Sequence, residues 1–316
     1  MDKITQVDIV IPCYNVEKTV KNCIEILIEQ SFSSNQYHCF FINDSSTDQT
    51  GEILEKYKNE KNITVIHHEK NSGLSSARNS GIEAGSSDFI AFLDGDMVPS
   101  RDWLMSFQSY FDKNIIAVMG DNVPPKDISL TPVEKYYFGS LRGARQYKDK
   151  DKIPLQYMLF GNAMIKRDAL VQCGMFDEKI KKYGGEDTDL AARIWDIYPD
   201  SFVFSKKSDA VHYHRRDLKD FCYSMEVYGK HNLPLLVKRY PHHKVKFAAD
   251  WIYSFKGYAI FNFIVRKVVI LIFKIYPSEF FIRYLVAASV IRGARKSNKL
   301  ISGKDRFFKY RYWKCR

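Results

Sequence analysis

The sequence predicts an α/β fold in which a mainly parallel central sheet is flanked by helices. Short apolar segments alternate with segments of helical periodicity through the first hundred residues, which is typical of parallel strands joined by crossover helices. The chain has 316 residues, 45% of them hydrophobic, enough for a sizeable core in one large or two ordinary domains. Polar residues follow three of the predicted strands, at the sheet edge where such folds bind ligands.

The elements of the first hundred residues follow from apolar periodicity and turn residues. Strands are expected where apolar residues run together between polar turn residues, and helices where apolar residues recur every three or four positions. In chain order we expect the strand Val7–Ile11, stopping at Pro12, the helix Glu17–Glu29, the strand His38–Ile42, a helix through Ile53, Leu54 and Tyr57, the strand Ile63–His67, the helix Leu74–Ala84 and the strand Phe89–Leu93.

The remaining segments suggest where the chain divides. Ala169–Phe176 and Asp187–Tyr198 are expected to be helices, and Ser208–Val211 is expected to be extended. We therefore divide the chain into a first domain, 1–243, with halves 1–98 and 99–243, and a helical, basic extension, 244–316.

The sequence lacks the motifs of several protein classes. None of the six cysteines forms a CxxC pair, so reduced cytosolic thiols are expected rather than a zinc ribbon or a disulfide framework. No glycine-rich dinucleotide motif follows the first strand, and no P-loop motif occurs. The N-terminal residues run directly into the first strand, so we expect no secretory signal.

The extension differs from the rest of the chain in charge. Residues 244–316 carry 17 Lys and Arg against three acids, whereas residues 1–243 carry 31 against 34. Its apolar stretches are interrupted by cations, the second by Arg283, too soon for a spanning helix of about 20 residues. We expect two amphipathic helices in a membrane interface, with a cap or a homo-oligomer contact as the alternative. Nucleic acid is not expected, because the cations are mixed with long apolar runs.

Asp94-Gly95-Asp96 directly follows the strand Phe89–Leu93 and is the strongest candidate for a metal site. Two carboxylates one residue apart offer hard oxygen ligands, which suit Mg²⁺ or Mn²⁺ carrying a phosphate-bearing ligand. An ordinary acidic turn is the alternative.

Asp44 and Arg78 are expected at the same edge of the sheet. Asp44 follows the second strand and could accept hydrogen bonds from a nucleobase or a sugar hydroxyl, with an Asx-turn or helix cap as the alternative. Arg78 falls in the first turns of a predicted helix and could reach a diphosphate, with an ordinary surface arginine as the alternative.

Two further candidates come from the second half of the first domain. Glu186 and Asp187 follow a Gly-Gly turn and could supply a general base, or could simply complement the helix dipole. His212 and His214 would face one side of an extended segment. One of them could join Asp96 on a divalent metal, with a structural histidine pair as the alternative.

Taken in order, these motifs resemble family 2 of the inverting glycosyltransferases, which have the Rossmann-like GT-A fold. The resemblance covers roughly residues 5–220 and is specific for the family but not for the sugar. It is carried by Val10–Asn15, Asn43–Asp48, Asn71–Asn79, Asp94–Asp96, Gly185–Asp187 and His212–Arg215.

The resemblance implies a role for each matching residue. Residues 1–98 would be the nucleotide-binding half and residues 99–243 the acceptor and catalytic half. On the nucleotide side, Pro12, Tyr14 and Asn15 would line the nucleoside pocket, Asp44 would bind the base, usually uracil, and Arg78 would approach the diphosphate. Asp94 and Gly95 would hold the ribose or donor sugar, and Gly161 and Asn162 would lie beside the donor sugar.

The resemblance also implies a metal site and a general base. Asp96 and His212, with His214 as second choice, would hold Mn²⁺ or Mg²⁺. Asp187 would be the general base, and Glu186 would lie near the acceptor.

One motif departs from the family pattern. Asn43-Asp44-Ser45-Ser46 stands where the family usually has Asp-Asp-Gly-Ser. The aspartate that contacts the base is kept, whereas Asn43 can both donate and accept, so base recognition is expected to be altered rather than lost. Serine in place of glycine at position 45 predicts a turn that does not need a positive φ.

The resemblance implies transfer of a hexosyl or N-acetylhexosaminyl group from a nucleotide sugar, a UDP-sugar as first choice, to a saccharide or lipid-linked saccharide. Asp189, the nearby spare carboxylate, should point away, which favours a single inverting displacement. The basic extension suggests a cytoplasmic protein bound peripherally to the inner face of the cell membrane, assembling a cell-surface polysaccharide. A sugar nucleotidyltransferase and an inactive membrane-docked scaffold are the alternatives; the first lacks a glycine-rich loop, and intact Asp94, Asp96 and Asp187 argue against the second.

Overall fold

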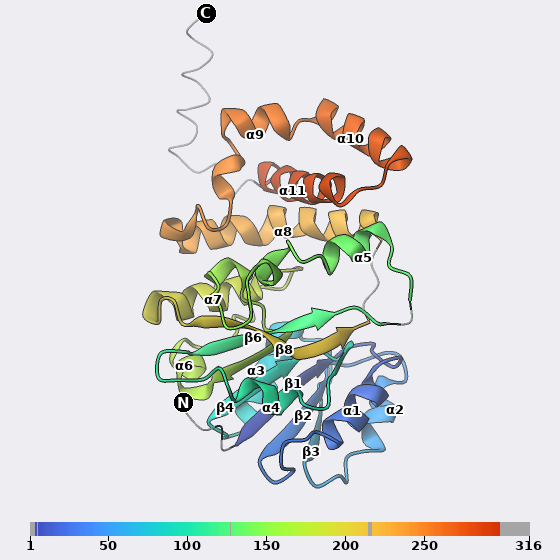
Figure 1. The fold of residues 1–316 in the computed structure, drawn as a ribbon, viewed down its shortest axis with the longest axis vertical. Helices are drawn as coiled ribbons and strands as arrows, with labels where there is room; N and C mark the ends of the chain where they lie inside the picture. The colour runs from blue at the N-terminus through green and yellow to red at the C-terminus, as the bar shows by residue number, and fades with distance from the viewer. Residues whose placement is uncertain (1–3, 5, 127, 214–216, 298–316) are drawn as a thin grey trace, which may run out of the picture. The chain divides into compact units, whose positions relative to one another are not determined.

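The computed structural model describes residues 4, 6–126, 128–213 and 217–297, which form two compact units (Figure 1). The first unit comprises the described parts of 1–129, 137–181 and 186–215. The second comprises 130–136, 182–185 and the described residues from 217 onward.

The first unit is built on one eight-stranded, mainly parallel sheet with the order β3-β2-β1-β4-β7-β6-β8-β5. The pairs β1–β2, β2–β3, β1–β4 and β6–β8 are parallel, and β7 and β5 introduce the antiparallel pairs. The strands are β1 (Val7–Cys13), β2 (Tyr37–Asn43), β3 (Ile63–His67), β4 (Phe89–Leu93), β5 (Met97–Pro99), β6 (Ala117–Val123), β7 (Asn162–Lys166) and β8 (Phe202–His212).

Helices cover this sheet because alternate strand residues point to opposite faces. Ile9 and Phe41 belong to the core that also contains Ile24 and Trp103. The helices of this unit are α1 (Val20–Ile28), α2 (Thr50–Glu55), α3 (Leu74–Ala84), α4 (Trp103–Phe107), α6 (Arg167–Gln172) and α7 (Glu186–Ile197), with the 3₁₀ turns η1 (Gly143–Gln146) and η2 (Leu155–Tyr157).

Helix α3 approaches the strands closely because of a glycine. A Cβ on Gly81 would lie 2.5 Å from Val10 Cγ1 and 2.8 Å from Ile42 Cδ1, so only glycine allows this contact. The close approach fixes α3 against β1 and β2, and it places Arg78 in the interior of the unit.

The predicted elements of the first hundred residues are confirmed, with three of them placed correctly to the residue. These are Ile63–His67, Leu74–Ala84 and Phe89–Leu93. The prediction that the first strand stops at Pro12 was wrong, since β1 continues to Cys13. A proline lacks only its own N–H, and the Pro12 carbonyl still accepts a hydrogen bond from the Gly95 N–H at 3.3 Å.

The second unit is helical. Its elements are α5 (Pro132–Tyr137, whose last residue is grouped with the first unit), α8 (Leu218–Arg239), α9 (Phe255–Ile260), α10 (Phe263–Ile275) and α11 (Glu279–Arg295), with the 3₁₀ turns η3 (Pro241–His243) and η4 (Ala249–Trp251). The sequence did not suggest α8, which contains Gly229 and Pro234, both unfavourable inside helices.

Helix α11 runs along α8 (Figure 1), and two glycines bring the helices together. A Cβ on Gly229 would lie 2.0 Å from Val290 O, and a Cβ on Gly293 would lie 2.1 Å from Glu226 O. Helix α11 therefore buries much of its surface against protein, including Ile282, Leu285 and Ala288. Among the described residues, no helix combines the length and hydropathy needed to cross a membrane.

Candidate active site

Polar loops meet at the carboxyl ends of β1, β2 and β4, as predicted. Strand β1 lies between the other two, so the segments that follow all three strands come together. The Asp44 N–H donates to Cys13 O at 2.9 Å, and the Asp94 N–H donates to Gly161 O at 2.8 Å. The loops that carry the predicted site residues are thus tied to each other through the backbone.

Arg78 joins two of the predicted acidic residues. Its Nη2 donates to Asp94 Oδ1 at 2.9 Å and its Nη1 donates to Asp187 Oδ1 at 2.8 Å. The side chain is only 1% exposed, and its guanidinium lies 5.0 Å from the ring centre of Phe176. Burial favours the neutral form, but the carboxylates outweigh this effect and raise the pKa of Arg78. Arg78 therefore fixes the separation of Asp94 and Asp187 as a charged bridge.

Asp187 and Glu186 form the first turn of α7. Burial, together with the charge of Asp187, raises the pKa of Glu186 to about 7, although Arg78 opposes the shift. Burial also raises the pKa of Asp187, again against the effect of Arg78. A raised pKa makes a carboxylate a stronger proton acceptor, so Glu186 could exchange a proton near neutral pH, and Asp187 is a stronger base than an ordinary aspartate.

The turn before α7 is held in a defined conformation. Gly184 and Gly185 both have positive φ, 75° and 101°. Within the second unit, Asn232 Nδ2 donates to Lys182 O at 2.9 Å. The residues that lead into Glu186 are therefore tied to a buried side chain of α8.

Asp96 and His212 lie together although they are far apart in sequence. Strand β5 pairs with β8 so that Met97 is opposite His212, and His212 Nε2 lies 3.2 Å from Asp96 Oδ2. Asp96 is partly exposed and His212 is largely buried. A carboxylate and an imidazole facing each other at a partly exposed position fit a divalent ion such as Mn²⁺ or Mg²⁺. His214, the second choice, lies outside the described residues.

Asp44 is more enclosed than the sequence suggested. It is buried, and its carboxylate accepts hydrogen bonds from His68 Nδ1 at 2.7 Å and from the backbone N–H groups of Ser72 and Gly73 at 2.8 Å each. The side chain thus holds the segment between β3 and α3, and its predicted contact with a base remains a prediction.

The expectation for Ser45 was wrong. Its φ is 59°, so this turn does adopt the left-handed conformation that the usual glycine would favour. Asn43 Oδ1 accepts a hydrogen bond from the Ser46 N–H at 3.0 Å, and this bond stabilises the turn that contains Ser45. Such local hydrogen bonds help a residue with a Cβ to occupy this region.

The nucleoside-side residues have different exposures. Tyr14 is exposed, as a ring that stacks on a base would be. Asn15 Oδ1 accepts the Thr47 N–H at 2.8 Å, so Asn15 links the loops after β1 and β2. Pro12 and Gly95 are joined through the backbone, and Thr19 Oγ1 donates to Gly95 O at 2.9 Å.

Asn162 is buried and its amide is used inside the protein. Its Oδ1 accepts from Trp103 Nε1 at 2.8 Å, and its Nδ2 donates to Asp121 O and Ser208 O at 3.1 Å each. The neighbouring Gly161 contributes its carbonyl to Asp94. Asn162 thus anchors the Gly161 backbone, and direct contact of Asn162 with a donor remains a prediction.

Sequence reasoning missed His68 and Phe176 as parts of the site. His68 bridges Asp44 and Ser80 Oγ, the latter through Nε2 at 2.9 Å. It directly follows β3, so the rule that sites gather at strand ends could have found it. Phe176 has no comparable signal, because only the fold brings its ring to Arg78.

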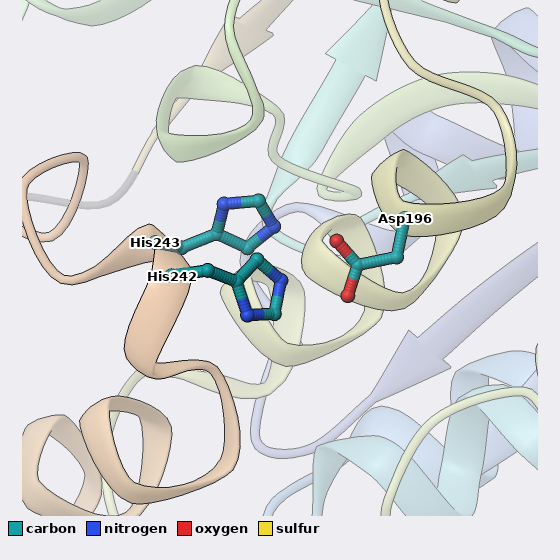
Figure 2. A group of neighbouring side chains, drawn as sticks. All are labelled: Asp196, His242 and His243. Carbon is teal, nitrogen blue, oxygen red and sulfur yellow. The ribbon is translucent and has the colours of Figure 1, made fainter.

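Figure 2 draws Asp196 of α7, together with His242 and His243, which are consecutive residues of η3. The two imidazole rings of the second unit lie 4.1 Å apart, measured between their centres. The carboxylate belongs to the first unit and the histidines to the second, so we assign no metal site to them.

The chain belongs to glycosyl transferase family 2, whose family model matches residues 8–174. EpsJ of Bacillus subtilis, described as an uncharacterized glycosyltransferase, is 38% identical over 115 residues, which cover 36% of this chain and 33% of EpsJ. The chain therefore matches about a third of that relative's length.

Solved structures show the same architecture. S. aureus TarS 1–349 in complex with UDP-GlcNAc has a TM-score of 0.56 and 16% identity, covering 92% of this chain and 89% of that one. The mannosyltransferase PcManGT from Pyrobaculum calidifontis, in complex with GDP-Man and Mn²⁺, has a TM-score of 0.60 and 17% identity, covering 92% and 88%. At such identities the likeness shows the fold alone, and it confirms the predicted GT-A fold.

Proposed function

We propose that this chain is an inverting glycosyltransferase that moves a sugar from a nucleoside-diphosphate sugar to a hydroxyl of a saccharide or lipid-linked saccharide. The observation that carries the proposal is the bridge from Asp94 through Arg78 to Asp187. The bridge joins the strand end expected to hold the donor to the helix expected to hold the base. Asp96, two residues after Asp94, faces His212, which the pairing of β5 with β8 brings to it from far along the chain. The family model covers the part of this site that contains Arg78, Asp94 and Asp96, and it supports a role in glycosyl transfer for that part.

In this proposal the oxygen of the acceptor hydroxyl attacks the anomeric carbon, and Asp187 accepts the proton of that hydroxyl. Arg78 is a positioning residue: its charge favours the ionised form of Asp187, and its hydrogen bond to Oδ1 fixes the orientation of the carboxylate. The guanidinium donates to only one of the two carboxylate oxygens, which leaves Oδ2 to accept the proton. Glu186, whose pKa is raised to about 7, lies beside it and would contact the acceptor. The nucleotide leaves from the opposite face, which inverts the anomeric centre.

A retaining double displacement would need a second carboxylate as nucleophile. Asp189, the nearest candidate along α7, is fully buried and paired with Arg193 at 3.0 Å. This carboxylate is engaged inside the protein, and that supports a single displacement.

The metal in this proposal is Mn²⁺ or Mg²⁺, held by Asp96 and His212. When bound, it would neutralise charge on the leaving diphosphate. Mn²⁺ accompanies GDP-Man in the structure of PcManGT, which has the same fold. We expect excess EDTA to abolish transfer and added Mn²⁺ or Mg²⁺ to restore it.

A UDP-sugar with a hexosyl or N-acetylhexosaminyl group is the first choice of donor, with Tyr14, Asn15 and Asp44 on the nucleoside side. UDP-GlcNAc accompanies TarS, and GDP-Man accompanies PcManGT, so donors with both bases belong in the first test. The acceptor would be part of a cell-surface polysaccharide. The protein would be attached peripherally to the inner face of the cell membrane, which the basic residues 244–316 favour.

The test is a screen of purified protein against a panel of UDP- and GDP-sugars, scored by nucleotide release and by the stereochemistry of the product. Asp187→Asn should bind the donor with unchanged affinity and lose turnover, whereas Asp168→Asn, at an exposed acid of α6, should behave as wild type. Turnover by Asp187→Asn near the wild-type rate would refute the base assignment. Donor binding without turnover in the wild type would favour an inactive scaffold.

A further inference from the structure

We propose that the outward face of α10 docks onto the surface of a membrane that contains anionic phospholipids. The inference is independent of the proposed glycosyl transfer, because it concerns only the second unit. The outward face is defined here by four residues, Ile264, Val268, Leu271 and Ile275.

These four side chains form one stripe along the helix. They are spaced by four, three and four residues, which places them on a single face of an α-helix. Ile264 is 72% exposed, Leu271 61% and Ile275 87%. A surface helix of a globular protein normally turns a polar face to water, so an exposed apolar stripe of this length is unusual.

The opposite face of α10 already has its packing partners. Val269 is buried, and it packs with Val265 and Phe273 in an apolar cluster that includes Leu285 of α11. Helix α10 is therefore apolar on both sides, and packing within the second unit accounts for only one of them. The outward stripe needs another explanation.

Exposed aromatic side chains extend this surface at both ends of the helix. Phe263 begins α10, Tyr276 follows its last residue, and Phe280 lies in the first turn of α11. All three are exposed. Aromatic rings at the edge of an apolar face are typical of a helix that lies in the headgroup region.

The charges around the stripe favour an anionic lipid surface as its partner. Lys267 and Lys274, seven residues apart, are exposed along one border of the stripe, and Arg283 is exposed beyond the turn. Glu279 is the only acidic residue in the stretch 251–297. Cations beside an apolar face match an anionic lipid surface, where the side chains can reach the phosphates.

A second copy of the chain fits this surface less well. Two such faces packed on each other would bring rows of lysines together with few acids to pair with them. The length of α10, 13 residues or about 20 Å, is also short of the roughly 30 Å hydrocarbon core, so the helix would lie in the interface plane.

The structure assigns membrane contact to fewer helices than the sequence suggested. Two amphipathic helices were expected in the interface, but α11 is largely packed against α8 and α10. Of these two helices, α10 with its flanking aromatic residues presents the longer exposed apolar stripe.

The test is flotation of the full chain with vesicles of phosphatidylcholine containing phosphatidylglycerol, compared with vesicles of phosphatidylcholine alone. Wild type should float with the anionic vesicles. The triple variant Ile264→Ser, Leu271→Ser, Ile275→Ser should lose binding by about tenfold or more. Leu141→Ser, at an equally exposed residue of the first unit, is the matched control and should float as wild type. All four positions are exposed, so an unchanged melting temperature should confirm folding.

Charge reversal at Lys267→Glu and Lys274→Glu should remove the preference for phosphatidylglycerol. Several outcomes would overturn the proposal: wild type that does not float, a triple variant that floats normally, or flotation that is lost only when residues 298–316 are removed. A wild-type dimer in sedimentation that the triple variant disrupts, without vesicle binding, would assign the surface to a second copy.

Discussion

Replacing Arg78 with methionine tests the centre of the proposed site. Methionine keeps an unbranched apolar side chain but removes the charge that joins Asp94 and Asp187. Removing one partner of a buried ion pair costs about 3–5 kcal/mol, because the remaining charges stay buried without compensation. Asp94 is partly exposed and therefore partly screened, so we expect the lower end, about 3 kcal/mol of unfolding free energy at pH 7.

The same variant should change the pH dependence of turnover. Arg78 holds the pKa of Asp187 down against burial, so its loss should raise that pKa further. A base with a higher pKa is protonated over a wider range, and the acidic limb of the kcat profile should move up by roughly one pH unit or more. Denaturant unfolding at pH 7 and kcat and KM between pH 5 and 9 measure the two effects.

Two controls make the result interpretable. Arg101→Met removes an exposed arginine and should change neither quantity. In an Asp187→Asn background, Arg78→Met should be less costly, because one of the two stranded carboxylates is gone. If Arg78→Met instead raises only the donor KM, leaving stability and the acidic limb unchanged, Arg78 contacts the diphosphate and the bridging role is refuted.

Three other predictions concern single residues. Ser45→Gly should stabilise the protein by about 0.5–1 kcal/mol by relieving its positive φ, whereas Ser45→Ala, which keeps the Cβ, should give no gain in denaturant unfolding. Glu186 has a raised folded-state pKa, so its contribution to stability is present at low pH and lost as pH rises through about 7. Glu186→Gln should therefore be more stable than wild type at pH 8, by up to about 3 kcal/mol, with no advantage near pH 4; equal stabilities at pH 8 would contradict the buried, charged environment. Asp96→Asn and His212→Ala should each weaken Mn²⁺ binding by at least about tenfold in calorimetric titration, and unchanged affinity for either would remove that residue from the metal site.

Much of the fold of the first unit could be predicted because its signals are local. The runs Ile63–His67 and Phe89–Leu93 and the helix Leu74–Ala84 are defined by periodicity and turn residues within each segment. Helix α8 could not be predicted in this way, because Gly229 and Pro234 lower its local propensity. Packing against α11 stabilises it instead, and propensity carries no information about that contact.

For the candidate site, the sequence could predict several of the residues that belong to it but not which residues contact each other. Strand ends of a parallel sheet share an edge, so Asp44, Asp94 and Asp96 were expected to lie together. The resemblance to family 2, carried by the order of the motifs, added Asp187 and His212. It did not indicate their partners. Arg78 was expected near a diphosphate but lies 1% exposed between two carboxylates, and Asp44 was expected to face a base but accepts three hydrogen bonds from the protein.

The sequence by itself determined the fold class, the edge of the sheet that carries the site and the residue types available there. Only the tertiary structure decided which carboxylate pairs with Arg78, that His68 holds Asp44, and that α10 rather than α11 presents an apolar face to its surroundings. The physical reason is range: strand and helix patterns arise from neighbours along the chain. Ion pairs, burial and exposed faces depend on residues such as Arg78 and Asp187, which lie 109 positions apart and meet only in the folded protein.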